Sequence, residues 1–96
     1  MSRGAIERRL AEVGDQLKHL RAELAIADEQ CSALEEEAED TRLRALLSET
    51  PLAEQEHRAA RRHADAMARH RSQVVDSIAS LEAAADDLLD RLAATT

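Results

Sequence analysis

Apolar residues recur at alternating intervals of three and four positions through both halves of the chain. The first-half series is Ile6, Leu10, Val13, Leu17, Leu20, Leu24, Ala27, Cys31, Leu34, Ala38, Thr41 and Ala45. The second-half series is Ala53, His57, Ala60, Ala64, Met67, Arg71, Val74, Ile78, Leu81, Ala85, Leu88 and Leu92. Paired from the outside in, the residue numbers always sum to 98, from Ile6 with Leu92 to Ala45 with Ala53. We call these two series the ladder.

The ladder predicts an all-α fold, an antiparallel two-helix coiled-coil hairpin. Alternating spacings of three and four are those of the a and d positions of a coiled-coil seam. A constant sum means that the chain reverses direction near residue 49, so that each a position faces a d position. We expect a single hairpin over residues 1–96, with helices at about 2–47 and 51–93 and a turn at 48–50.

The sequence Ser48-Glu49-Thr50-Pro51 marks the break between the two helices. Thr50 suits the N-cap and Pro51 the first helical position, where no backbone donor is needed. A single kinked helix is the rival interpretation. It would require the a positions Ala45 and His57 to be a multiple of seven apart, which they are not.

The composition indicates a thin core and an acidic surface. The chain has no Phe, Trp or Tyr, so the side chains that usually dominate cores are missing. Self-association of two copies into a four-helix arrangement is therefore expected. The net charge of −7 argues against direct binding of nucleic acid or of an anionic membrane. One cysteine allows no internal disulfide, and no long apolar run is present, so we expect a cytoplasmic protein.

Charges beside the seam favour the same register. In an antiparallel pair, e positions flank e positions and g positions flank g positions. The expected cross-helix pairs are Glu35 with Arg61, Arg42 with Glu54, Arg44 with Glu56, and Glu37 with His63. Arg9 and Arg91 form the one like-charged pair.

Leucines that the ladder does not use gather near the turn. They are Leu43, Leu46, Leu47 and Leu52, and Glu49 and Glu54 lie among them. A contiguous apolar patch usually marks a contact site, so we expect this tip to bind a partner protein or a second copy. The alternative is that the leucines fold over the hairpin end as a cap. A second, smaller stripe at e positions and beside them is Ala68, Val75, Ala79 and Leu89.

Two ladder positions are polar enough to fix the register. Arg71 faces Ala27, and polar residues at a positions often specify register or oligomeric state. His57 faces Thr41 in a layer that histidine titration could make sensitive to pH. Each also has a simpler interpretation, as a long side chain reaching solvent or as a solvated residue in a loosely packed end.

Cys31, Met67, His63 and His70 combine a thiol, a thioether and two imidazoles, which suits a soft metal ion or a redox sensor. The ordinary interpretation is that Cys31 and Met67 are seam residues and that the histidines are solvated. We favour it, and expect no cofactor. No nucleophile–base pattern, glycine-rich phosphate loop or HExxH motif is present, so the sequence predicts a non-enzymatic protein.

Two resemblances bear on function. The tip Leu47-Ser48-Glu49-Thr50-Pro51-Leu52 and the following Glu56-His57-Arg58 resemble short, uncharacterised coiled-coil hairpin proteins of high-GC Gram-positive bacteria, which implies no activity. The acidic tip with Glu49 and Glu54 is also similar in shape to the coiled coil of Gre-type transcript cleavage factors. That likeness implies a transcription accessory factor inserting its tip into RNA polymerase, although the tip sequence departs from that family's.

Overall fold

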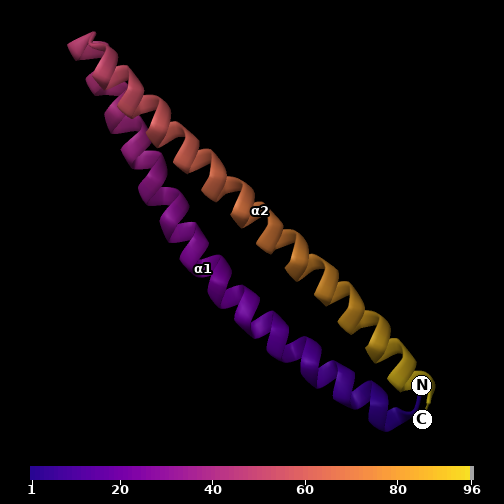
Figure 1. Cartoon of the computed structure of the whole chain (residues 1–96). Coiled ribbons are helices and arrows are strands. Elements are labelled where there is room, and N and C mark those ends of the chain that lie inside the picture. The colour runs from indigo at the N-terminus through magenta and orange to yellow at the C-terminus, as the bar shows by residue number, and fades with distance from the viewer. Residues whose placement is uncertain (96) are drawn as a thin grey trace. The chain divides into compact units, whose positions relative to one another are not determined.

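The computed structural model describes residues 1–95, which form two helices joined by a two-residue connection (Figure 1). Helix α1 is Arg3–Ser48 and helix α2 is Pro51–Ala94. No strand occurs within residues 1–95. The all-α helical hairpin predicted from the ladder is confirmed, and the helices begin and end within one residue of the expected limits.

Side-chain caps begin both helices. The Ser2 hydroxyl accepts the backbone N–H of Ala5 at 3.2 Å, and the Thr50 hydroxyl accepts that of Ala53 at 3.1 Å. Each satisfies one of the backbone donors that a helix start leaves without an intrahelical partner. At the end of α1, Glu49 has a φ of 50° and donates its N–H to the Ala45 carbonyl at 3.0 Å. This left-handed residue is what ends α1 and lets Thr50 start α2.

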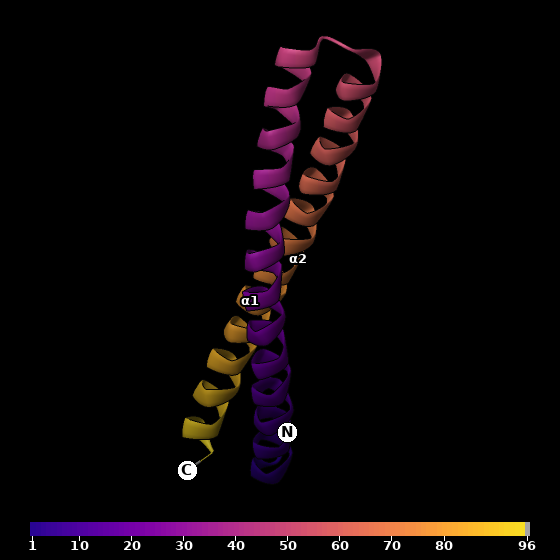
Figure 2. The same cartoon turned by 90° about the vertical axis from the view of Figure 1, so that its left-hand side faces the viewer.

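The chain divides into two compact units, each containing a segment of both helices. The first unit comprises Met1–Leu24 and the α2 segment from Val74 onwards, and the second unit is Ala25–Gln73. Within each unit the two helix segments lie side by side and run in opposite directions (Figures 1 and 2). Both chain ends belong to the first unit, and the helix connection belongs to the second.

The first unit has a core of large aliphatic side chains. Its buried residues are Ile6, Val13, Leu17, Val74, Ile78 and Leu88. Half-buried side chains that pack against them are Leu10, Leu20, Leu24, Leu81, Ala85 and Leu92. All of these are ladder residues, so the predicted seam is the observed core of this unit. Burying a leucine or isoleucine side chain contributes about 1.5–3 kcal/mol, so this unit holds most of the apolar stabilisation.

The second unit is packed by small side chains. Ala38, Ala60 and Ala64 form its buried cluster, with Leu34 half-buried against them. Ala27 and Thr41 are also buried. Alanine removes little apolar area from water, so this unit gains less from burial than the first. Within residues 1–95, every ladder residue is buried or half-buried except Arg71.

The cross-helix ion pairs follow the prediction only in part. Arg61 Nη1 donates to Glu35 Oε2 at 3.0 Å, as expected. The pairs predicted for Arg42 and Arg44 are wrong. Arg42 binds Glu39 at 2.7 Å and Arg44 lies 3.8 Å from Glu37, both on α1.

The remaining charged tip residues are also held within one helix. Glu54 lies 3.7 Å from Arg58 on α2 instead of meeting Arg42, and Glu37, predicted to meet His63, faces Arg44. Residues four or seven apart lie on the same side of a helix, so these pairs form without reaching across the seam. Arg9 and Arg91 likewise bind Glu12 and Asp87 on their own helices at 3.1 Å.

Candidate functional site

The leucine tip, defined as Leu43, Leu46, Leu47 and Leu52, lies in the second unit where α1 ends and α2 begins. The exposed fractions of these residues are 44%, 62%, 86% and 64%. A leucine that folded over the hairpin end would be largely buried, and none of these is. Within this chain the leucines therefore stay in contact with water.

Charged side chains surround the leucine tip. Arg42 makes two hydrogen bonds to the Glu39 carboxylate, at 2.9 and 2.7 Å, and these hold the pKa of Glu39 below its usual value. Glu54 pairs with Arg58, and Glu49 is exposed on the connection. The carboxylates at the tip thus alternate with guanidinium groups, and the surface around the leucines carries both signs of charge.

A shallow cavity of about 220 Å³ lies beside the leucine tip. Its lining combines apolar and charged side chains from both helices, namely Arg42, Ala45, Leu46, Glu54, His57 and Arg58. Leu46 therefore belongs both to the exposed patch and to the wall of the cavity. This hollow is large enough for one side chain of a partner and too shallow to enclose a small-molecule substrate.

The second stripe is divided between the units. Val75, Ala79 and Leu89 belong to the first unit and Ala68 to the second. All four are exposed, with Val75 at 37% and Leu89 at 51%. The stripe is therefore a surface feature of α2 that the seam does not cover.

The two polar ladder residues, Arg71 and His57, each contact a polar side chain of α1. Arg71 is exposed and its Nε donates to the Asp28 carboxylate, which raises the pKa of the guanidinium. His57 Nδ1 lies 3.4 Å from the Thr41 hydroxyl, so the predicted polar layer is present. Thr41 Oγ1 also lies 2.9 Å from the carbonyls of Glu37 and Ala38, so its hydroxyl is satisfied within α1 whatever the state of the histidine.

The four soft-ligand residues differ in exposure. Cys31 and Met67 are half-buried at ladder positions, whereas His63 and His70 are exposed. Within residues 1–95, no group of three or more His, Cys, Asp or Glu side chains is arranged to hold a metal ion.

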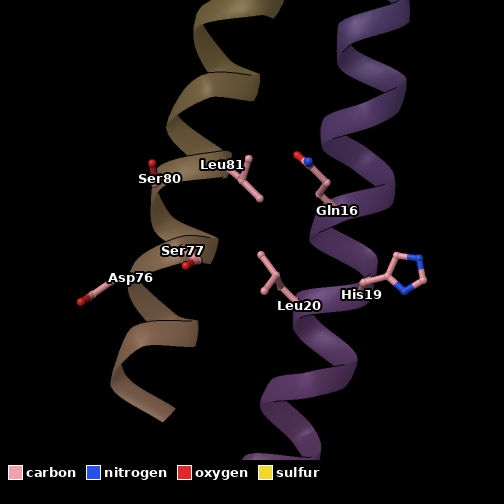
Figure 3. Close-up of a pocket in the computed structure, with 7 residues that line it drawn as sticks. All are labelled: Gln16, His19, Leu20, Asp76, Ser77, Ser80 and Leu81. Carbon is pink, nitrogen blue, oxygen red and sulfur yellow. The ribbon is translucent and has the colours of Figure 1, made fainter. Parts of the chain in front are cut away.

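A larger open groove of about 690 Å³, which the sequence analysis missed, lies in the first unit (Figure 3). Its lining residues are Gln16, His19, Leu20, Asp76, Ser77, Ser80 and Leu81. Leu20 and Leu81 point into the space between the helices, while His19 and Asp76 point away on opposite sides (Figure 3). The groove brings no nucleophile next to a base. The short side chains of Ser77 and Ser80 beside the seam were the signal that could have revealed it.

No family model, curated protein or solved structure matches this chain. Neither helix, over the residues described, has a stretch long and apolar enough to cross a membrane. The fold defines the class of the protein as an antiparallel helical hairpin.

Proposed function

We propose that this protein is a non-enzymatic protein–protein interaction module, a coiled-coil hairpin that contacts its partner through the leucine tip. The observation that carries this proposal is the exposure of Leu46, Leu47 and Leu52, each more than 60% exposed in one short stretch. Scattered exposed leucines are common on protein surfaces, but a cluster on one end of a hairpin is not.

The energetics favour a protein partner. Burying an exposed leucine against an apolar surface contributes about 1.5–3 kcal/mol, so three of them can anchor a contact. The hollow lined by Leu46 and His57 can accept one apolar side chain in return. An apolar centre with a charged rim is the usual anatomy of a protein interface.

The rim charges supply the orientation of the partner. Arg42 and Arg58 are each already bound to a carboxylate, so the rim presents ion pairs rather than a field of one sign. Phosphate-rich partners require a surface of uncompensated positive charge. We therefore propose a protein partner or a second copy, with no direct contact to nucleic acid and none to a membrane, and we place the module in the cytoplasm.

The test is capture of partners from the native cell on the immobilised chain, followed by mass spectrometry, with two forms as bait. The first is the natural chain, and the second carries Leu46→Ser, Leu47→Ser and Leu52→Ser. We expect the triple variant to lose partners that the natural chain holds, because apolar area is replaced by hydroxyls. Circular dichroism should show unchanged helicity, since none of the three leucines contributes to either core.

Ile26→Ser is the matched control, because Ile26 is 56% exposed and lies on α1 away from the tip. It should capture the same partners as the natural chain. If the triple variant captures the same set with the same yield, the leucine tip is not the contact site and the proposal fails.

A further inference from the structure

One flank of the first unit combines exposed apolar side chains with charges of opposite sign on its two helices. It is the flank on which Arg21 Nη2 and Glu82 Oε2 approach to 4.0 Å across the helix pair. Between residues 11 and 21 on α1 and between residues 75 and 89 on α2, successive steps of three and four residues from this pair stay on the same flank. We call this surface the lateral face; its members are Ala11, Gly14, Lys18 and Arg21 on α1, and Val75, Ala79, Glu82, Asp86 and Leu89 on α2. All nine are exposed.

The two halves of the lateral face differ in size and in charge. The α1 half has small residues, Ala11 and Gly14, followed by two cations. A Cβ added at Gly14 would meet no atom within 4 Å, so this half leaves open space above the backbone. The α2 half has the larger side chains Val75 and Leu89, and its charges are acidic. The α1 half and the α2 half are therefore complementary both in side-chain size and in the sign of their charges.

A two-fold axis parallel to the helices would bring these halves together. It places α1 of one copy over α2 of the other, with the two helices antiparallel. In the first unit, residues at the same level have numbers that sum to 98, so Lys18 is level with residue 80. Lys18 then lies about 3 Å along the axis from Glu82 of the second copy and about 9 Å from Asp86. Both carboxylates are within reach of a lysine side chain.

The apolar residues match in the same arrangement. Leu89 of the second copy is level with residue 9, about 3 Å along the axis from Ala11. The small Ala11 and the open Gly14 leave room there for a leucine to pack against the backbone. Val75 is level with residue 23, next to the aliphatic stem of Arg21. Leu89 of each copy therefore packs against small residues of the other copy's α1, and this contact occurs twice in each dimer.

The other simple two-fold is disfavoured by charge. An axis perpendicular to the helices at the middle of the lateral face would set α1 against α1 and α2 against α2. The middle of the lateral face is level with residues 16 and 82, so Glu82 would then face its own copy, and Lys18 would lie about 6 Å along the helix from its own copy. Like charges brought together across an interface destabilise it, so the charge pattern selects the parallel axis.

The area of the lateral face is that of a weak, reversible contact. Its longer half, residues 75–89, at 1.5 Å per residue, and two helices about 10 Å wide, give about 450 Å² per copy. The total of about 900 Å² is in the range of weak, transient protein interfaces. We infer that the lateral face of the first unit is a homodimer interface in which α1 packs on α2 of a second copy, forming a four-helix arrangement. This surface is separate from the leucine tip.

Two charge reversals test the inference by sedimentation equilibrium at up to about 0.5 mM, far above the micromolar range of typical specific association. Lys18→Glu alone and Glu82→Lys alone should each weaken dimerisation about tenfold, because two attractive contacts per dimer become repulsive. An equimolar mixture should form a heterodimer as tight as the natural dimer. In it, Glu at position 18 meets Lys at position 82, and the other contact keeps its natural residues.

The mixture separates a true interface from a folding defect, since a misfolded variant cannot be rescued by another. Labelling one variant with ¹⁵N lets native mass spectrometry distinguish the heterodimer. Arg9→Glu and Asp87→Lys make comparable charge changes at positions that are not three, four or seven residues from any member of the lateral face, and they should dimerise as the natural chain does.

Any one of four results would overturn the inference. One is a natural chain that stays monomeric at the highest concentration. Another is a pair of charge variants that dimerise as well as the controls, or a mixture that shows no rescue. The last is loss of the dimer in the Leu46→Ser, Leu47→Ser, Leu52→Ser variant, which would move the interface to the tip.

Discussion

The Glu35 carboxylate is held by Arg61 across the helix pair of the second unit. Hydrogen bonds from the guanidinium are the main cause that lowers the pKa of Glu35 below its ordinary value of 4.5, and the charge of Arg61 adds to them. A group whose pKa is lowered by folding stabilises the folded state at a pH above its unfolded pKa. That contribution is lost as the pH falls through the lowered value.

Glu35→Gln should therefore lower the melting temperature by a few degrees at most at pH 7, since both partners are solvent-exposed. The difference between the variant and the natural chain should shrink as the pH falls below 4.5, because the natural carboxyl becomes protonated too. Thermal unfolding followed by circular dichroism at several pH values measures this difference in melting temperature. Glu36→Gln removes an exposed carboxylate one residue away and controls for net charge. A difference that is unchanged at pH 3 would contradict the ion-pair explanation.

Gly14 is an exposed glycine inside α1 whose side of the helix is open. Alanine at that position should raise the free energy of unfolding by about 0.5–1 kcal/mol, because glycine loses more backbone freedom on folding. Urea unfolding of Gly14→Ala measures the gain. Gly4→Ala should gain less, since Gly4 lies in the first turn and its Cβ would stand 3.4 Å from Arg8 Nη1. The measurement is made at a protein concentration too low for dimerisation, and no gain at Gly14 there would contradict the open space on that side of α1.

At the scale of elements, the connection between α1 and α2 depends on one strained residue. Glu49 has a φ of 50°, a conformation that costs a residue with a side chain about 1 kcal/mol relative to glycine. Glu49→Gly should stabilise the chain by about that amount, measured by urea unfolding. Glu49→Ala keeps the Cβ and removes only the carboxylate. If it stabilises as much as Glu49→Gly, the effect is one of charge and not of backbone strain.

The sequence was a reliable guide to the elements and to burial. Ladder positions could be predicted because the helical period is a property of the backbone, and Leu47 and Leu52 could be predicted to lie off the seam for the same reason. Ion-pair partners were less predictable. Arg42 had carboxylates within reach on both helices, and the choice of Glu39 depends on side-chain rotamers. The groove beside Leu20 was missed because it results from short neighbouring side chains, which periodicity does not register.

At the scale of the whole molecule, the two units differ in the kind of core they contain and in the exposed apolar surface they carry. The first unit holds the large aliphatic core and the lateral face, and the second unit holds the alanine seam and the leucine tip. An apolar residue on the ladder is explained by the hairpin itself. An exposed apolar residue off the ladder is where contacts with other proteins are to be sought.

The ladder is the central claim, and the natural Cys31 allows a direct test of it. The residue number that sums with 31 to 98 is 67, and Met67 is half-buried like Cys31. In Met67→Cys, mild oxidation at low protein concentration should form an intramolecular disulfide between positions 31 and 67. The bridge should form because facing a and d positions of an antiparallel pair are neighbours. It would be detected as a mass loss of about 2 Da and as the loss of both free thiols.

His63→Cys, an exposed position four residues away on the flank of α2, is the matched control. It should form the intramolecular bridge much more slowly than Met67→Cys under the same oxidation. Rapid and preferential bridging of Cys31 to position 67 within one chain is the result that the ladder predicts. Equal bridging at position 63, or bridging only between chains, would contradict the register on which the whole account rests.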